Sequence, residues 1–201
     1  MFVLVDIAYF IALPFLLLFA CIARFKGHPR RRDLSARFGM GETLASNSKR
    51  VLLHAVSVGE VNAIRMLVQD MNEQGYDVVV CVTTDTGISR ARELYSETCT
   101  VTRFPFDFSF SIRRFLNRIQ PTVVALVELE VWPNLISTCA NRKIPVIVIN
   151  GRLSERSFRR YNIAKPLLQR TFRQLTAIGM QNENYANRVV QLGAHDVSVL
   201  G

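Results

Sequence analysis

The residues that decide the fold are Val51-Leu52-Leu53-His54-Ala55-Val56-Ser57-Val58-Gly59-Glu60. An apolar run rich in β-formers comes first, then a Ser-Val-Gly turn, and then a helical pattern over residues 61–74. The stretch therefore predicts a strand, a turn and a helix, with Glu60 in the first helical turn. In an open α/β sheet, ligands bind beyond the carboxyl ends of the strands, where loops lead into helices. We expect Glu60 to lie at such a site.

Glu60 has a structural and a functional interpretation. Ser57 and Glu60 have the spacing of a capping box, in which the Ser side chain and the Glu side chain each satisfy an amide of the first turn. Gly59 would let a ligand approach the backbone closely. The helix dipole keeps a carboxylate in the first turn ionised, as a general base requires. The residues alone leave both roles open.

The rest of the chain alternates short β-branched runs with longer amphipathic runs, which is typical of βα units on a parallel sheet. The expected strands are residues 51–56, 78–83, 101–104, 122–127, 146–149, 177–178 and 197–200. The expected helices are residues 61–74, 88–95, 108–119, 134–142, 154–171 and 184–192, with a short one at 34–38. The predicted fold class is α/β, a Rossmann-like parallel sheet with helices on both faces over residues 51–201.

Polar side chains follow the second and third expected strands. In Thr83-Thr84-Asp85-Thr86-Gly87, the hydroxyls of Thr84 and Thr86 suit an anion or a sugar, because first-turn amides point outward at a helix start. An ordinary N-cap is an equally good interpretation. Asp107, after the third strand, is expected to cap the helix that follows it.

The fourth expected strand ends in Glu128-Leu129-Glu130-Val131-Trp132-Pro133-Asn134. In an extended segment Glu128 and Glu130 would point to the same side. The only Trp of the chain and a Pro at a helix start indicate a shaped turn. Solvated loop acids are the alternative interpretation of this pair.

Asn150-Gly151-Arg152 follows the fifth expected strand. Ser154 is expected to cap the next helix, which leaves Arg152 free to meet a carboxylate or a phosphate. Met180-Gln181-Asn182 forms another polar turn at the same predicted edge.

The amino-terminal residues differ from the rest. Residues 2–23 are almost wholly apolar, broken by Asp6 and Pro14. As a helix they would be ~33 Å long, enough for a hydrocarbon core of about 30 Å. The basic residues Arg24, Lys26, Arg30, Arg31, Arg32 and Arg37 follow, which places that end in the cytoplasm. We expect a membrane anchor at residues 1–25 and a basic juxtamembrane linker at 26–50; a buried or amphipathic helix is the alternative.

The composition limits which classes of partner and cofactor we expect. The formal net charge is +9, yet the basic stretch follows an apolar span and no nucleic-acid motif accompanies it, so we expect no nucleic acid. The four cysteines have no CxxC spacing and the three histidines are dispersed. We therefore predict no metal and no other cofactor.

Residues 54–60, 128–134 and 150–157 together resemble the amino-terminal half of the Kdo transferases. The resemblance implies a glycosyltransferase of the GT-B type, which transfers 3-deoxy-D-manno-octulosonic acid (Kdo) from CMP-Kdo to lipid A precursor in lipopolysaccharide biosynthesis. It implies inversion without a metal, at the cytoplasmic face of the cell inner membrane. In that family this half takes the acceptor and carries the catalytic base, whose position here is Glu60. The acceptor-binding residues would be Ser57, Gly59, Thr84, Thr86, Glu128, Glu130, Asn150 and Arg152.

The second domain of the family, which holds most contacts to the donor nucleotide, would follow Gly201. We therefore expect the chain to be the acceptor-binding half, with CMP-Kdo bound through a domain that this chain lacks. The alternatives are an inactive truncated transferase and a non-catalytic, membrane-tethered module that binds an anionic glycolipid. A nucleotide-binding Rossmann domain is disfavoured, because no GxGxxG follows the first strand.

Overall fold

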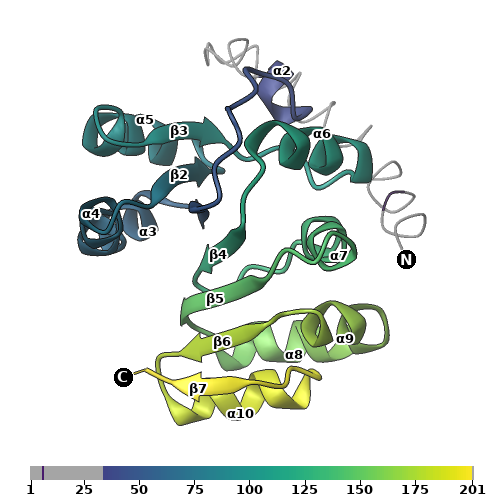
Figure 1. Cartoon of the computed structure of the whole chain (residues 1–201). Coiled ribbons are helices and arrows are strands. Elements are labelled where there is room, and N and C mark those ends of the chain that lie inside the picture. The colour runs from purple at the N-terminus through teal and green to yellow at the C-terminus, as the bar shows by residue number, and fades with distance from the viewer. Residues whose placement is uncertain (1–5, 7–33, 201) are drawn as a thin grey trace, which may run out of the picture.

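A computed structural model describes residue 6 and residues 34–200 and contains one seven-stranded sheet (Figure 1). The strand order is β3-β2-β1-β4-β5-β6-β7, and every neighbouring pair is parallel. Central β1 places Leu53 between Val80 of β2 and Ala125 of β4. The strands are β1 Arg50–Ala55, β2 Asp77–Val82, β3 Thr100–Arg103, β4 Val123–Val127, β5 Val146–Gly151, β6 Ala177–Met180 and β7 Val197–Val199.

Helices cover both faces of this sheet, as predicted. Side chains alternate along β1, so Leu53 packs with the apolar face of one helix layer and Leu52 with the other. The first layer is α3 Val58–Ala63, α4 Arg65–Glu73 and α5 Asp85–Tyr95. The second contains α6 Ser109–Ile119, α7 Pro133–Asn141, α8 Glu155–Ile163, α9 Lys165–Arg173 and α10 Glu183–Gln191. The parallel α/β prediction is confirmed.

The helix expected at residues 61–74 begins earlier and has an irregular residue inside it. Ser57 is the N-cap, so α3 starts at Val58. Ile64 has ψ 4°, outside the helical value near −42°, and separates α3 from α4. The Ile64 amide still donates to the Glu60 carbonyl and the Val68 amide to the Ile64 carbonyl, so the bonding continues through the break.

The prediction of a single helix at residues 154–171 is wrong, because this segment forms two helices, α8 and α9. Pro166 lies in the first turn of α9, where it needs no amide hydrogen. In a continuous helix the same Pro would lack a bond to residue 162 and would clash with the preceding turn. The chain therefore breaks at Ala164, which ends α8 and begins α9.

The predicted anchor lies outside the described residues except for Asp6, and the predicted linker is described only from Leu34. None of the helices in the described part of the chain is long and apolar enough to cross a membrane. Residues 34–37 form α2, close to the short helix expected there. From α2 onward the chain is bonded to the domain: the Phe106 amide donates to the Arg37 carbonyl, and the Leu44 amide to the Arg118 carbonyl.

Candidate active site

Glu60 is buried at the amino end of α3, with both carboxylate oxygens held by donors. Oε1 accepts from the Ser57 hydroxyl over 2.9 Å, and Oε2 accepts from the Val56 amide over 2.8 Å. The Glu60 amide donates to the Ser57 hydroxyl over 3.4 Å, so the predicted cap is present. It departs from the standard box, because the carboxylate bonds the amide of Val56 and not that of the cap residue. A carboxylate has about four lone-pair sites, so these two bonds leave acceptor capacity for a ligand.

Gly59, next to Glu60, is exposed, and nothing inside the protein requires a glycine there. A Cβ added at Gly59 would meet only the Ser57 hydroxyl, at an ordinary 3.7 Å. Gly87 at the start of α5 is different, because its Cβ would lie 2.8 Å from Val82 Cγ1. Gly59 therefore leaves the backbone of the first turn open from outside.

Glu128 does not continue β4, so the predicted extended arrangement of Glu128 and Glu130 is wrong. β4 ends at Val127, and Glu128 has a left-handed φ of 61°. The Glu130 amide then donates to the Glu128 carbonyl over 3.2 Å, which closes a tight turn. A left-handed residue other than Gly costs about 1–2 kcal/mol. Such strained residues concentrate at functional sites. The turn places Glu128 and Glu130 at the edge of the sheet where Glu60 lies.

Neighbouring carboxylates change the pKa values of Glu128 and Glu130. Burial, and then the charges of Glu60 and Glu128, raise the pKa of Glu130 to about 7. Burial and the Glu60 charge likewise raise the pKa of Glu128, while the Arg152 guanidinium opposes that shift. Because like charges disfavour each other's ionised form only when close, Glu60, Glu128 and Glu130 form one acidic cluster.

Residues from β5 and α8 border this cluster. Asn150 has a left-handed φ of 56°, and its side-chain oxygen accepts from Gln181 Nε2 over 3.0 Å. The side chain of Arg152 is exposed and has no hydrogen bond or ion pair within the described part of the chain. Tyr161 of α8 was not predicted as a site residue; burial and the charge of Glu130 raise its pKa. No local pattern marks Tyr161, because only the fold brings α8 beside the loop after β4.

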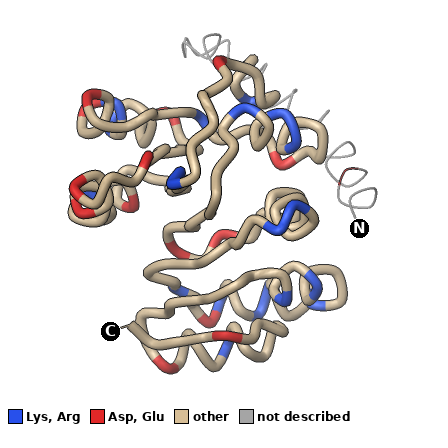
Figure 2. The backbone as a smooth tube through the Cα atoms, in the orientation of Figure 1, with Lys and Arg blue, Asp and Glu red and all other residues tan. Residues whose placement is uncertain are grey.

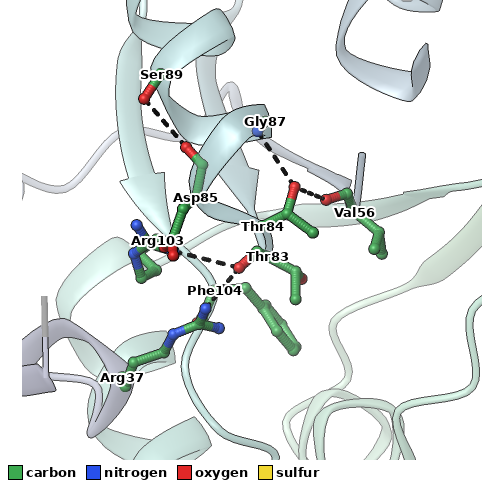
Figure 3. A network of polar contacts seen from close by, with 9 residues as sticks. All are labelled: Arg37, Val56, Thr83, Thr84, Asp85, Gly87, Ser89, Arg103 and Phe104. Atoms are coloured by element: carbon green, nitrogen blue, oxygen red, sulfur yellow. Dashed lines mark hydrogen bonds and ion pairs between the residues drawn. The ribbon is translucent and has the colours of Figure 1, made fainter. Parts of the chain in front are cut away.

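The loop after β2 is tied to the loop after β1 (Figure 3). Thr84 Oγ1 donates to the Val56 carbonyl over 2.7 Å and accepts from the Gly87 amide over 3.2 Å, so Thr84 is the N-cap of α5. Val56 thus bonds Glu60 through its amide and Thr84 through its carbonyl. The Thr86 side chain, in contrast, belongs to an exposed residue of the first turn of α5.

Two guanidinium groups hold the end of β2 in place (Figure 3). Arg37 Nη2 donates to the Thr83 carbonyl over 2.6 Å, and Arg103 Nη1 donates to it over 3.3 Å. Arg103 also forms an ion pair with Asp85 at 2.8 Å. Arg37 from the predicted linker is therefore part of the edge that carries the candidate site.

Asp107 caps a different helix from the one predicted. Its carboxylate accepts from the Asn134 amide over 3.0 Å and from the Leu135 amide over 2.8 Å, so it caps α7 and not α6. The N-cap residue of α7 is Trp132, which has no capping side chain, so a carboxylate from another loop takes that role. This bond fixes the start of α7 and with it the loop that carries Glu128 and Glu130.

His54 lies beneath the site and is neutral. Its Nε2 is 3.0 Å from Thr83 Oγ1, and its ring packs 4.2 Å from Phe104 and 5.7 Å from Trp132, measured between centroids. Burial lowers the pKa of His54 to about 3. The aromatic packing supports the turn before α7 and gives His54 no access to a ligand.

The geometry of the acidic cluster does not support binding of a metal ion. Over residues 6 and 34–200, no group of three or more His, Cys, Asp or Glu side chains is placed to hold a metal ion. The absence of a metal from the reaction stays a prediction.

Comparison with known proteins gives the family. The sequence profile described as "3-Deoxy-D-manno-octulosonic-acid transferase (kdotransferase)" matches residues 32–201. The chain belongs to the Kdo transferase family. This confirms the resemblance carried by residues 54–60, 128–134 and 150–157.

Individual relatives agree with this placement in the Kdo transferase family. The 3-deoxy-D-manno-octulosonic acid transferase of Haemophilus influenzae is 33% identical over 183 residues, which cover 90% of this chain and 43% of that protein. The transferase of that name from Bordetella pertussis is 32% identical over 173 residues, covering 83% of this chain and 40% of that protein. The chain thus spans less than half the length of these relatives.

A solved structure shows the same fold. UDP-GlcNAc 2-epimerase from Neisseria meningitidis, bound to UDP-GlcNAc, matches with a TM-score of 0.53 at 15% identity. The match covers 76% of this chain and 46% of that chain. At this identity the likeness concerns the fold alone.

Proposed function

We propose that the chain is the acceptor-binding half of a Kdo transferase, which transfers Kdo from CMP-Kdo to lipid A precursor in lipopolysaccharide biosynthesis. Glu60 is the general base in this proposal. It takes the proton from an acceptor hydroxyl as the oxygen attacks the anomeric carbon of Kdo, and CMP leaves from the opposite side. Such an in-line attack inverts the anomeric configuration.

The observation that carries this proposal is the fixed carboxylate of Glu60. Its two oxygens are held by Ser57 and Val56 at the carboxyl edge of the central strand, and lone pairs remain for a proton. A general base must lie within hydrogen-bond reach of the proton it takes. The open backbone at Gly59 lets an acceptor approach to that distance.

The acidic loop after β4 supports binding of a sugar. Carboxylate oxygens accept hydrogen bonds from sugar hydroxyls, and Glu128 and Glu130 lie in the same cluster as Glu60. Thr86 and Asn150 add polar groups at the neighbouring loops. In this proposal they orient the acceptor, while Thr84 and Ser57 hold the loops themselves.

Arginines on α8, the helix that carries Tyr161, support an anionic acceptor. The helix α8 carries Arg156, Arg159 and Arg160, and these residues line a hollow of about 400 Å³ together with Glu155. Figure 2 colours the Lys and Arg positions of the backbone blue. Arg159 is paired with Glu155, whereas the guanidinium groups of Arg156 and Arg160 have no hydrogen bond or ion pair within residues 6 and 34–200. Residues four apart lie on one face of a helix, so Arg156 and Arg160 present two guanidinium groups together. Phosphate groups of the glycolipid are their proposed ligands.

The remaining parts of the proposal are assigned to groups outside the acidic cluster. The donor CMP-Kdo is bound through the second domain of the family, and amides and cationic side chains stabilise the leaving CMP without a metal. The apolar residues 1–25 keep the chain at the cytoplasmic face of the inner membrane. The arginines of α8 also favour a second candidate function, binding of an anionic glycolipid without transfer.

A binding experiment tests the acceptor-half proposal. We expect the purified chain to bind phosphorylated lipid A precursor in detergent micelles and to prefer it to the same lipid after removal of its phosphates. Little or no transfer from CMP-Kdo is expected from the chain alone. Equal binding of both lipids would contradict acceptor binding, and rapid turnover without a second domain would contradict the half-enzyme assignment.

A further inference from the structure

The loop after β3 contacts a loop that does not neighbour it in the sheet. β3 lies at one end of the strand order, and β2 and β1 separate it from β4. Asp107, in the loop after β3, nevertheless bonds the first turn of α7, which follows the loop after β4. The loop at the edge of the sheet therefore reaches past two strands to the segment that carries Glu128 and Glu130.

Asp107 holds the start of α7 with both oxygens of a buried carboxylate. Oδ2 accepts from the Asn134 amide over 3.0 Å, and Oδ1 accepts from the Leu135 amide over 2.8 Å. The Asp107 carbonyl also accepts from Asn134 Nδ2 over 2.5 Å. Hydrogen bonds to an ionised carboxylate are stronger than neutral ones, and the amino end of a helix carries partial positive charge. These bonds therefore fix where α7 begins.

The same loop also holds the residue that precedes α7. The ring of Phe104 is buried, and its centroid lies 4.9 Å from that of Trp132, the N-cap residue of α7. On the other side of the acidic loop, Leu129 is buried in the same hydrophobic cluster as Phe104. Glu128 and Glu130 flank Leu129 in the sequence. Their positions are thus set by a buried anchor and by a helix start that Asp107 and Phe104 hold.

The acidic loop needs such a constraint, because its own residues oppose its conformation. Glu128 has a left-handed φ of 61°. The charges of Glu60 and Glu128 raise the pKa of Glu130 in addition to the effect of burial, which means that the ionised loop is repelled by its neighbours. A strained conformation persists only where the surrounding structure imposes it. The cap on α7 is one such constraint.

We infer that Asp107 is a positioning residue: through the start of α7 it holds the loop that carries Glu128 and Glu130 beside Glu60. Asp107 itself contacts no acceptor in this inference. Its consequence for binding rests on the proposed function, in which Glu128 and Glu130 orient the acceptor. Loss of the cap lets the loop relax and moves Glu130 away from the other two carboxylates.

Urea unfolding of the whole chain tests the position of the loop without any ligand. At each pH, the unfolding free energy is compared with that of the same chain carrying Glu130→Gln. For the natural chain this difference should fall between pH 4.5 and 7, because the pKa of Glu130 is raised from 4.5 to about 7 in the folded state. Tyr161 stays protonated over this range, since its pKa is raised as well.

We expect Asp107→Asn to abolish this fall. With the loop relaxed, Glu130 leaves Glu60 and Glu128, and its pKa returns toward 4.5. A fall of unchanged size in Asp107→Asn would overturn the inference.

Asp77→Asn is the matched control for a loss of stability elsewhere. Asp77 begins β2, at the opposite end of the strands, and pairs with buried Arg50 at 2.6 Å. Its loss should lower stability while the Glu130-dependent fall persists. Disappearance of the fall in both variants would show that any destabilisation removes it, and would contradict a positioning role for Asp107.

Asp107→Glu covers the case in which Asp107→Asn does not fold. It keeps the charge, but the longer side chain cannot place both oxygens on the two amides in the same way. We expect it to reduce the Glu130-dependent fall, and an unchanged fall would contradict the inference. If neither variant folds, as judged by circular dichroism, Asp107 is required for folding itself and the positioning role is refuted.

Binding of phosphorylated lipid A precursor separates this inference from the proposed function. We expect Asp107→Asn to bind the lipid on the order of tenfold more weakly, about the contribution of one polar contact. Asp77→Asn should bind it like the natural chain. If Asp107→Asn loses the pH-dependent fall but keeps full lipid binding, the loop is positioned as inferred, and the acceptor role of Glu128 and Glu130 is what fails.

Discussion

At the start of α3, the Ser57 hydroxyl both donates a hydrogen bond to Glu60 and accepts one from it. Ser57 Oγ donates to Glu60 Oε1 over 2.9 Å and accepts from the Glu60 amide over 3.4 Å. The capping role and the catalytic role are therefore not exclusive, because the same bonds that satisfy the helix end also fix the carboxylate. Substitutions around this pair separate the two roles.

Ser57→Ala removes the cap and one of the two bonds to the Glu60 carboxylate. We expect a stability loss of about 1 kcal/mol and a fall in transfer rate, measured after fusion to the second half of a family member. The matched control is Asn182→Ala, which removes the N-cap of α10 and its bond from the Tyr185 amide without touching Glu60 or α8. A similar melting-temperature loss with an unchanged rate is expected for the control. Equal rate losses in both variants would mean that Ser57 acts only through stability.

Gly59→Ala tests whether the open backbone serves the acceptor. The added Cβ meets nothing closer than 3.7 Å, and Ala favours a helix over Gly by up to about 1 kcal/mol. We expect unchanged or higher thermal stability together with weaker binding of lipid A precursor. Gly87→Ala is the opposite case, since its Cβ would lie 2.7 Å from Thr84 Oγ1 and should lower the melting temperature. Unchanged lipid binding by Gly59→Ala would show that no ligand approaches there.

Glu130 should make stability depend on pH. Burial and the two neighbouring carboxylates raise the pKa of Glu130 from 4.5 to about 7, so the folded state favours its protonated form. The contribution is fully present below pH 4.5 and is lost as the pH rises through 7. Relative to Glu130→Gln, the unfolding free energy of the natural chain should therefore fall between pH 4.5 and 7, as measured by urea unfolding. A difference that stays constant over this range would contradict the acidic cluster.

Arg156 and Arg160 should contribute to recognition of phosphate groups. We expect the double variant Arg156→Gln, Arg160→Gln to bind phosphorylated lipid A precursor at least tenfold more weakly, on the scale of charge-assisted hydrogen bonds. Arg65→Gln with Arg92→Gln removes the same charge from exposed positions of the other helix layer and should change binding little. If both pairs weaken binding equally, net charge and not the hollow along α8 attracts the lipid.

Much of the fold was predictable because its signals are local. The alternation of β-branched and amphipathic runs predicted the seven parallel strands, and Ser57-x-x-Glu60 predicted a helix start. The break at Pro166 was also a local signal, but the amphipathic pattern on both sides of it obscured the division into α8 and α9.

The parts that sequence reasoning missed depend on distant partners. Asp107 satisfies amides 27 and 28 residues away, so its position beside α6 predicted the wrong helix. The left-handed turn at Glu128 is imposed by tertiary structure, since nothing in Glu-Leu-Glu favours it. Tyr161 likewise gains Glu130 as a neighbour only when remote elements pack together.

Transfer by Glu60→Gln is the most direct test of Glu60 as the general base. Gln keeps an oxygen that can accept one of the two bonds from Ser57 and Val56, but it cannot take up the acceptor proton. With the second half of a family member fused to the chain, we expect a loss of 10²–10⁴-fold in rate, while melting temperature and lipid binding stay close to natural values. Glu183→Gln, which alters the first-turn acid of α10, should keep full activity. A Glu60→Gln enzyme that retains most of its transfer rate would show that Glu60 is a cap alone.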